Sequence, residues 1–371
     1  MATKHLMQPT DNNRKRIQQI VIGTLVVLGL LLLIPSNHAL AQTKERYYSS
    51  FSTNVQRGII VGVDNRTTGP ITISGWDRDV IEARAVSSRG AEIVLVGRAE
   101  TSGVPRLFLK ADYANLEQPA TPTVPVDKVP VSDDKVVQIR LEVRVPRYTE
   151  IERIEVFNSD VQVSDVETSI VVSGRSSTIT LKRVGAADVQ TRDGNVEIEG
   201  VNGLASVVTA SGGVRVSKSK RLVHVVSIIG PIEVSCSSGR VDVSNTGSPI
   251  TLANIDGDVD AIATNSNVTL SGNLREGARY YLKSMSGRVE MELPGNPRGF
   301  TSTLSSYRGR IENDFELDKK ITKQGKQTIV SPEDRRVIQR FGNGKTQVLL
   351  DSFEGLVRLT KVEEASIPAC K

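Results

Sequence analysis

The sequence contains few of the side chains that build nucleic-acid or metal sites. Aromatic residues make up 4% of the 371 residues, and only three histidines are present. So few aromatics provide no platform for base stacking, and the basic residues are interspersed with acidic ones, so we expect no nucleic-acid partner. His5 and His38 precede the expected mature chain, which leaves His224 alone and excludes a multi-histidine metal centre. No phosphate loop, dinucleotide fingerprint or nucleophile elbow is present, so we predict no cofactor and no catalysis.

Cysteine is also scarce, with only Cys236 and Cys370 in the chain. Two cysteines so far apart in sequence give no indication of proximity, even in an oxidising compartment. The favoured interpretation is two unpaired thiols, with a bridge as the alternative.

The one long hydrophobic run is shorter than a typical membrane span. It covers Ile20 to Ile34 and follows Arg14 to Arg16, and Ala39-Leu40-Ala41 comes after it. A run of 15 residues is shorter than the roughly 20 that cross a bilayer. We therefore predict that residues 1–41 are a cleaved export signal, with a retained anchor through residues 17–34 as the alternative. The chain would then reside in the periplasm, the cell envelope or the extracellular space.

The sequence does contain a regular repeat, which runs from Ser159 to Ser286. Its leading apolar residues are spaced 18, 17, 18, 18, 18 and 18, and they are Val161, Ile179, Val196, Val214, Ile232, Ile250 and Val268. A second column is spaced by 18 throughout, and it comprises Val171, Val189, Val207, Val225, Val243 and Ala261. Two apolar columns in phase indicate a solenoid in which each coil is one repeat.

Each leading residue begins an apolar-polar-apolar triplet, so period two places the middle residue outward. These middle residues form one file: Gln162, Thr180, Glu197, Arg215, Glu233, Thr251 and Thr269. Turn residues such as Gly194, Gly212 and Gly230 precede the triplets. A left-handed hexapeptide helix is rejected, because Lys220 and Asp256 are among the residues six positions after the leading aliphatics. The prediction is an all-β, parallel β-helix (β-solenoid) with about 18 residues per turn, two or three strands per turn and right-handed coiling.

The flanking regions lack the 18-residue spacing. Residues 42–157 alternate as strands and are predicted to form an antiparallel N-terminal region, with a proline-rich loop at 117–134. Residues 158–313 hold the repeats, and residues 314–371 are predicted to form a C-terminal cap. Such end regions protect the exposed edges of a stack from further pairing.

Several segments together resemble a known family. They are Gly69-Pro70-Ile71-Thr72-Ile73-Ser74-Gly75-Trp76-Asp77, Leu141-Glu142-Val143-Arg144-Val145-Pro146, the glycine-headed repeats and Phe341-Gly342-Asn343-Gly344. On these segments the chain resembles the bacterial DUF4097 putative-adhesin family over nearly all of the mature sequence. The resemblance implies an exported β-solenoid of the cell envelope and brings no catalytic residues.

One polar file could carry chemistry. The column beside the second set of valines reads Ile170, Asp188, Ser206, His224, Asp242 and Asp260. Stacked Asp242 and Asp260 beside His224 could hold Ca²⁺ or act as an acid–base pair, as in polysaccharide-active β-helix enzymes. The alternative, which we favour, is a solvated polar face, and Asp256-Gly257-Asp258 then provides only a turn.

A neighbouring column could form a docking surface. It reads Val172, Gln190, Val208, Val226, Ser244 and Ile262. Outward placement would give an apolar stripe, and a strand offset at a corner would instead bury these residues. Trp76 is predicted to be a packing anchor rather than a sugar platform.

The sequence thus favours a non-catalytic, exported, adhesin-like or structural module. Its partner would be an envelope polymer, a cell surface or another protein, and membrane contact would be limited to residues 17–34. The alternatives are the polysaccharide-active enzyme and an anchored component of an envelope-stress sensor.

Overall fold

The computed structural model describes residues 47–65, 67–87, 92–101, 104–112, 138–315, 319–320 and 335–370. These residues belong to one compact unit, Glu45–Lys371. The predicted export segment and the proline-rich loop at 117–134 lie outside them. Within the described ranges, no helix has both the length and the apolar character needed to cross a membrane.

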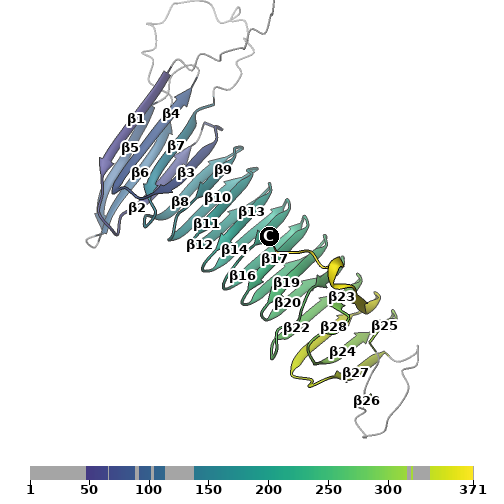
Figure 1. The fold of residues 1–371 in the computed structure, drawn as a ribbon. Helices are drawn as coiled ribbons and strands as arrows, with labels where there is room; N and C mark the ends of the chain where they lie inside the picture. The colour runs from purple at the N-terminus through teal and green to yellow at the C-terminus, as the bar shows by residue number, and fades with distance from the viewer. Residues whose placement is uncertain are drawn as a thin grey trace, which may run out of the picture. The chain divides into compact units, whose positions relative to one another are not determined.

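All strands of the described chain belong to two sheets, which we call sheet A and sheet B (Figure 1). Sheet A has, in spatial order, β1 (Tyr47–Asn54), β4 (Val80–Ser87), β7 (Arg140–Pro146), β3 (Ile71–Trp76), β9 (Val161–Ser164), β11 (Ile179–Val184), β13 (Val196–Val201), β15 (Val214–Ser217), β17 (Ile232–Ser238), β19 (Ile250–Asp256), β21 (Val268–Ser271), β23 (Val289–Pro294), β29 (Val357–Val362) and β25 (Ile311–Asn313). Sheet B has β26 (Lys319–Lys320), β27 (Arg336–Phe341), β24 (Phe300–Ser306), β28 (Thr346–Ser352), β22 (Arg279–Ser284), β20 (Val259–Ala263), β18 (Val241–Asn245), β16 (Val223–Ile229), β14 (Ala205–Ser211), β12 (Ala186–Thr191), β10 (Ser169–Arg175), β8 (Glu150–Phe157), β2 (Ile60–Asn65), β6 (Val104–Asp112) and β5 (Glu92–Thr101). A 3₁₀ turn, η2 (Glu364–Ser366), follows β29.

The repeats form a parallel β-solenoid with two strands per coil, one in each sheet, which confirms the predicted architecture. The leading column is in register, with Val196 paired to Val214 and Val214 to Ile232. All three side chains are buried between the sheets. Burying an aliphatic side chain of this size contributes about 1.5–3 kcal/mol, so each coil stabilises its neighbours through the shared core.

The second apolar column is correct from Val189 onward, but its first member is wrong. Val189 pairs with Val172, which is buried, whereas Val171 pairs with Asp188 on the outer face. Two residues separate Val184 from Ala187, whereas three separate the paired positions Val201 and Ala205, so this coil has 17 residues. A shift of one residue moves a side chain to the other face of a strand. For the same reason Ile170, predicted to lie in the polar file, is buried.

Two positions of the coil need unusual backbone conformations. At the corner before sheet A, the predicted glycine turns are confirmed, and Gly212 has φ +108°. A Cβ atom there would lie 2.1 Å from the carbonyl oxygen of Gly194 in the previous coil, so only glycine fits without strain. Toward the end of the sheet A strands, a second file has positive φ in consecutive coils, at Asp165, Arg183, Gly200, Lys218, Cys236, Asn254 and Gly272.

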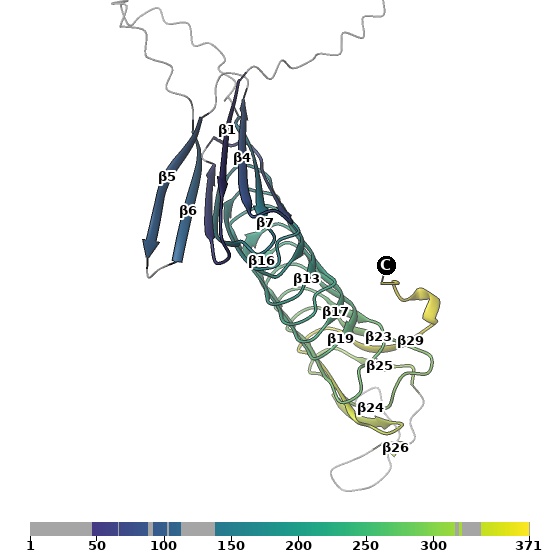
Figure 2. The same ribbon diagram turned by 60° about the vertical axis from the view of Figure 1, so that its left-hand side comes forward.

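At the N-terminal end, segments distant in sequence interleave. β3 lies between β7 and β9 and is parallel to both, and β2 lies between β6 and β8 in the same way. The predicted antiparallel pairing therefore applies to β1, β4 and β7 and to the β5–β6 hairpin, but not to β2 and β3 (Figure 2). Buried Asn65 ties the segments together by donating to the carbonyl oxygens of Gly69 and Ile139, at 2.9 and 2.8 Å.

The C-terminal end interleaves as well. β28 lies between β22 and β24, and β29 lies between β23 and β25, so the last coil in sequence is not the last coil in space. Strands from the expected C-terminal cap thus enter the stack. Phe300, Phe315 and Phe341 close this end of the core, with ring centroids 5.4–5.6 Å apart.

The expectation of two unpaired thiols is wrong, because Cys236 and Cys370 form a disulfide. After β29 the chain runs back past Asn254 to Cys236, so that its end lies beside β17 (Figure 1). On the way, Asn254 in β19 donates to the carbonyl oxygen of Pro368. Sequence separation gave no sign of this return path. Spatially, the tail spans from β29 to β17.

Candidate functional site

The outer face of sheet A carries the predicted polar file. Stacked strands place Glu197, Arg215 and Glu233 in register on consecutive coils. Arg215 forms an ion pair with Glu233 at 2.8 Å, and both side chains are exposed. Exposed pairs of this kind contribute about 0.2–1 kcal/mol, so they favour the register more than they stabilise the fold.

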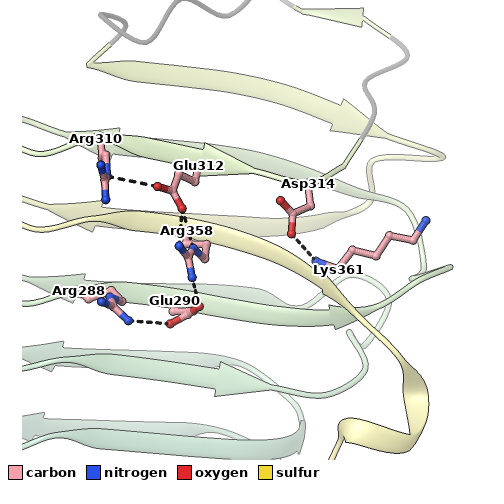
Figure 3. Close-up of polar contacts among 7 residues, drawn as sticks. All are labelled: Arg288, Glu290, Arg310, Glu312, Asp314, Arg358 and Lys361. Carbon is pink, nitrogen blue, oxygen red and sulfur yellow. Dashed lines mark hydrogen bonds and ion pairs between the residues drawn. The ribbon is translucent and has the colours of Figure 1, made fainter.

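The file continues onto the interleaved C-terminal coil (Figure 3). Arg358 in β29 lies between Glu290 in β23 and Glu312 in β25. Its guanidinium is 2.6 Å from the Glu312 carboxylate and 3.4 Å from that of Glu290. The hydrogen bond to Glu312 raises the pKa of Arg358 above its ordinary value. This cluster therefore helps to hold β29 between β23 and β25.

The three candidate residues of the polar file lie together on the outer face of sheet B. Register places His224 beside Asp242 and Asp242 beside Asp260. The nearest Asp242 oxygen is 3.7 Å from Nδ1 of His224 and 3.9 Å from Nη2 of Arg240. These contacts show a loosely paired, half-exposed polar face. A catalytic or Ca²⁺-binding role for these three residues stays a prediction.

The described part of the chain contains no group of three or more His, Cys, Asp or Glu side chains placed to hold a metal ion. Asp256-Gly257-Asp258 forms a corner. A Cβ atom on Gly257 would lie 1.7 Å from the carbonyl oxygen of Gly239, and Asp258 Oδ1 accepts a hydrogen bond from the backbone N–H of Arg279 at 2.9 Å. The Asp258 side chain thus binds the backbone of the next coil.

The apolar stripe predicted on sheet B does face outward. Val208, Val226, Ser244 and Ile262 are in register on consecutive coils. Val208 is 44% exposed and Ile262 is 40% exposed. Val172, predicted as the first member, is buried because of the shorter coil, so the stripe begins after Gln190.

Trp76 is half-buried at the end of β3. Its indole N–H donates to the carbonyl oxygen of Val80 at 2.8 Å, and the guanidinium carbons of Arg78 and Arg144 lie 5.1 and 5.8 Å from the indole ring. These contacts agree with a packing anchor.

A cleft lies beneath the disulfide-linked tail. It has a volume of about 960 Å³ and is lined by residues of β17, β19 and the tail. Its charged side chains are Lys218, Asp256, Arg275, Arg298 and Glu364. Lys218 already pairs with Glu199 at 2.8 Å, and Arg275 donates to the carbonyl oxygen of Asp256 at 3.3 Å. Sequence reasoning missed this cleft because it depends on the disulfide.

Comparisons with known proteins do not identify a family for this chain. No family model matches the sequence, so the DUF4097 resemblance stays a prediction. No curated protein is similar to it. Among solved structures, it is similar to a "putative cell adhesion protein" from Clostridium sporogenes, with 10% identity, a TM-score of 0.19, and coverage of 85% of this chain and 100% of the other. It is also similar to a "putative adhesin" from Bacteroides fragilis, with 10% identity, a TM-score of 0.26, and coverage of 84% and 97%.

Proposed function

We propose that this chain is an exported, adhesin-like module of the cell envelope that binds its partner through an outer face of the solenoid and performs no catalysis. The observation that supports binding is the apolar stripe of Val208, Val226 and Ile262. The core is filled by the alternate residues of the same strands, so the stripe lies outside it, with Val208 and Ile262 exposed and Val226 half-buried. Apolar area left in water is unfavourable unless a partner covers it.

Export is supported by the sequence of residues 1–41. Mass spectrometry of the chain from its native host tests it directly. A mature N-terminus at Gln42 would support a released module, whereas retention of residues 17–34 would favour the anchored sensor component.

Binding can be tested with the purified exported chain on immobilised cells and on isolated envelope polymers. We expect binding that falls at least about tenfold when Val208, Val226 and Ile262 are all replaced by serine. A matched control replaces Thr180 and Thr251 on the outer face of sheet A by serine. Failure to bind either material would leave only a scaffold role.

The enzyme alternative is tested on the same preparation. Uronan and glycan cleavage is measured with and without Ca²⁺, together with the variants Asp242→Asn and Asp260→Asn. We expect no cleavage, and we expect both variants to bind like the parent chain. Cleavage that disappears in either variant would overturn the non-catalytic proposal.

A further inference from the structure

Three corners near the C-terminal end share one hydrogen-bonded motif. Each has a serine that accepts a hydrogen bond from the backbone N–H of a glycine three residues later, and the distances are 2.8, 2.8 and 3.1 Å. The pairs are Ser284 with Gly287, Ser352 with Gly355, and Ser306 with Gly309. Each serine hydroxyl also donates to a carbonyl oxygen of the neighbouring sheet A corner, at 2.7–2.9 Å. The backbone of all three corners is therefore fixed.

The residue after each serine is large and apolar, and it points into solvent. Met285, Phe353 and Tyr307 are 50%, 42% and 53% exposed. Parallel backbone hydrogen bonds place them at the same position of three neighbouring coils. The rings of Tyr307 and Phe353 stack with centroids 5.0 Å apart and planes 9° apart. We call these three residues, together with Arg308 and Arg335, the corner patch.

The corner itself does not require large apolar side chains. The same position in the two preceding coils is occupied by Thr246 and Thr264, and the backbone ladder continues through them unchanged. The three apolar residues are therefore a feature of the surface and not of the turn. Exposed apolar side chains that gather on adjacent rigid elements are typical of interaction sites.

Two arginines give the corner patch its charge. The guanidinium carbon of Arg335 lies 5.0 Å from the centroid of the Tyr307 ring, and that of Arg308 lies 5.4 Å from the centroid of Phe353. Arg308 also pairs with Glu354 at 3.1 Å, whereas Arg335 has no ion-pair partner among the residues that the structure describes. Each ring already has another ring and a guanidinium against it. Stacking of a sugar would have to displace these contacts, whereas an apolar side chain can pack against the exposed edges.

We propose that the corner patch binds a polypeptide segment of a partner protein that carries apolar anchors next to a carboxylate. Tyr, Met, Phe and Arg are the side chains enriched in protein–protein interfaces, and aromatic and Arg residues dominate their binding energy. Arg335, which has no ion-pair partner within the described ranges, favours an acidic partner, and the fixed corners reduce the entropy lost on binding. This surface is separate from the stripe on sheet B, so the two proposals can fail independently.

The test uses the full exported chain and a phage-displayed library of random twelve-residue peptides as the probe. Peptides are selected on the parent chain, and the enriched ones are synthesised and their Kd is measured. The test variants are Phe353→Thr and Tyr307→Thr, which copy the residues of the Thr246 and Thr264 corners and so preserve the turn. Ile228→Thr is the matched control, because Ile228 is exposed at the same position of a distant coil.

We expect enriched peptides to combine Asp or Glu with Leu, Phe or Trp, and to bind each test variant at least about tenfold more weakly. Arg335→Glu should also weaken binding, and the loss of affinity should be larger in low salt than in high salt. Ile228→Thr should leave the affinity unchanged. Failure to enrich any peptide, or enrichment of peptides that bind Phe353→Thr like the parent, would overturn the proposal. So would self-association or glycan-array binding that disappears in the same variants, since either would identify a different occupant.

Discussion

The hydroxyl of Ser352 donates a 2.9 Å hydrogen bond to the carbonyl oxygen of Gly287, a residue of the adjacent coil that is 65 positions away in sequence. Ser352 is buried and also accepts from the N–H of Gly355 at 2.8 Å. One side chain thus joins the inserted C-terminal coil to the coil beneath it.

Replacing this serine should weaken the C-terminal end of the stack. In Ser352→Ala, the half-buried N–H of Gly355 and the buried carbonyl oxygen of Gly287 each lose a partner, so we expect the free energy of unfolding to fall by about 1–3 kcal/mol. Urea unfolding with circular dichroism measures the loss. Ser286→Ala, at an exposed position in the corresponding corner, is the control and should match the parent. Equal stability of the two variants would contradict the role given to Ser352.

Glycine at the corner before sheet A should not be replaceable. Gly212→Ala combines a positive φ with a close approach to the Gly194 carbonyl oxygen, so we expect a loss of at least about 1–3 kcal/mol. The neighbouring Gly213→Ala is a matched control. Its φ is not positive, and its nearest neighbour would be a side-chain atom 3.5 Å away. Differential scanning calorimetry on both variants would show an effect at Gly212 alone.

The carboxylate of Asp165 should make stability depend on acid pH. Hydrogen bonds from the Arg183 guanidinium, at 2.7 Å, hold the pKa of Asp165 below its ordinary value. A lowered folded-state pKa favours the ionised form, so the stabilisation is complete above the ordinary Asp pKa of about 3.9 and disappears as pH falls through the lowered value. The pair is partly exposed, so we expect Asp165→Asn to cost up to about 1 kcal/mol at pH 7.

The measurement compares the parent chain and Asp165→Asn by urea unfolding at pH 7 and at pH 2. The difference between them should shrink at pH 2. Asp160→Asn, at an exposed position, serves as the control. A difference that stays constant over this range would show that the carboxylate charge is not the cause.

The disulfide should stabilise the whole stack. Cys236 and Cys370 enclose a long loop, with a sequence separation of 134. In the chain-entropy model, a loop of this length contributes about 4–5 kcal/mol to stability. We expect Cys370→Ser and the double variant Cys236→Ser/Cys370→Ser to lose the same free energy of unfolding, and thiol titration of the unfolded parent chain to find no free thiol. Detection of two thiols would contradict the bridge.

The repeat was predictable because two columns of aliphatics mark successive coils, and all seven residues of the leading column are buried. The wrong placement of Val171 was not predictable, because the second column keeps its spacing of 18 at this point. A missing residue in the link after β11 nevertheless shifts the register of the strand. The interleaved coils at both ends were also beyond sequence reasoning, because the pairing partners of β3 and β28 are distant in the chain. Periodicity is a local signal, and it carries no information on such returns.

The candidate site, like the fold, was predictable only in part. Register alone brought His224, Asp242 and Asp260 together as expected. The corner patch was missed, although a signal exists in the sequence. The segments Ser284-Met285-Ser286-Gly287, Ser306-Tyr307-Arg308-Gly309 and Ser352-Phe353-Glu354-Gly355 share a serine, a large apolar residue and a glycine at fixed offsets. Their unequal spacing hid them from a search for 18-residue periods, because β28 and β29 are out of sequence order.

The bond between Cys236 and Cys370 also decides how the protein responds to tension. A pull applied between β1 and Cys370 enters the stack at β17 through the covalent bridge, and the coils between the two cysteines carry none of it. The extension available before a covalent bond must break is therefore limited to the residues that precede Cys236. Reduction adds the length of the enclosed loop, and it lets β29 peel from between β23 and β25 as the first element to yield.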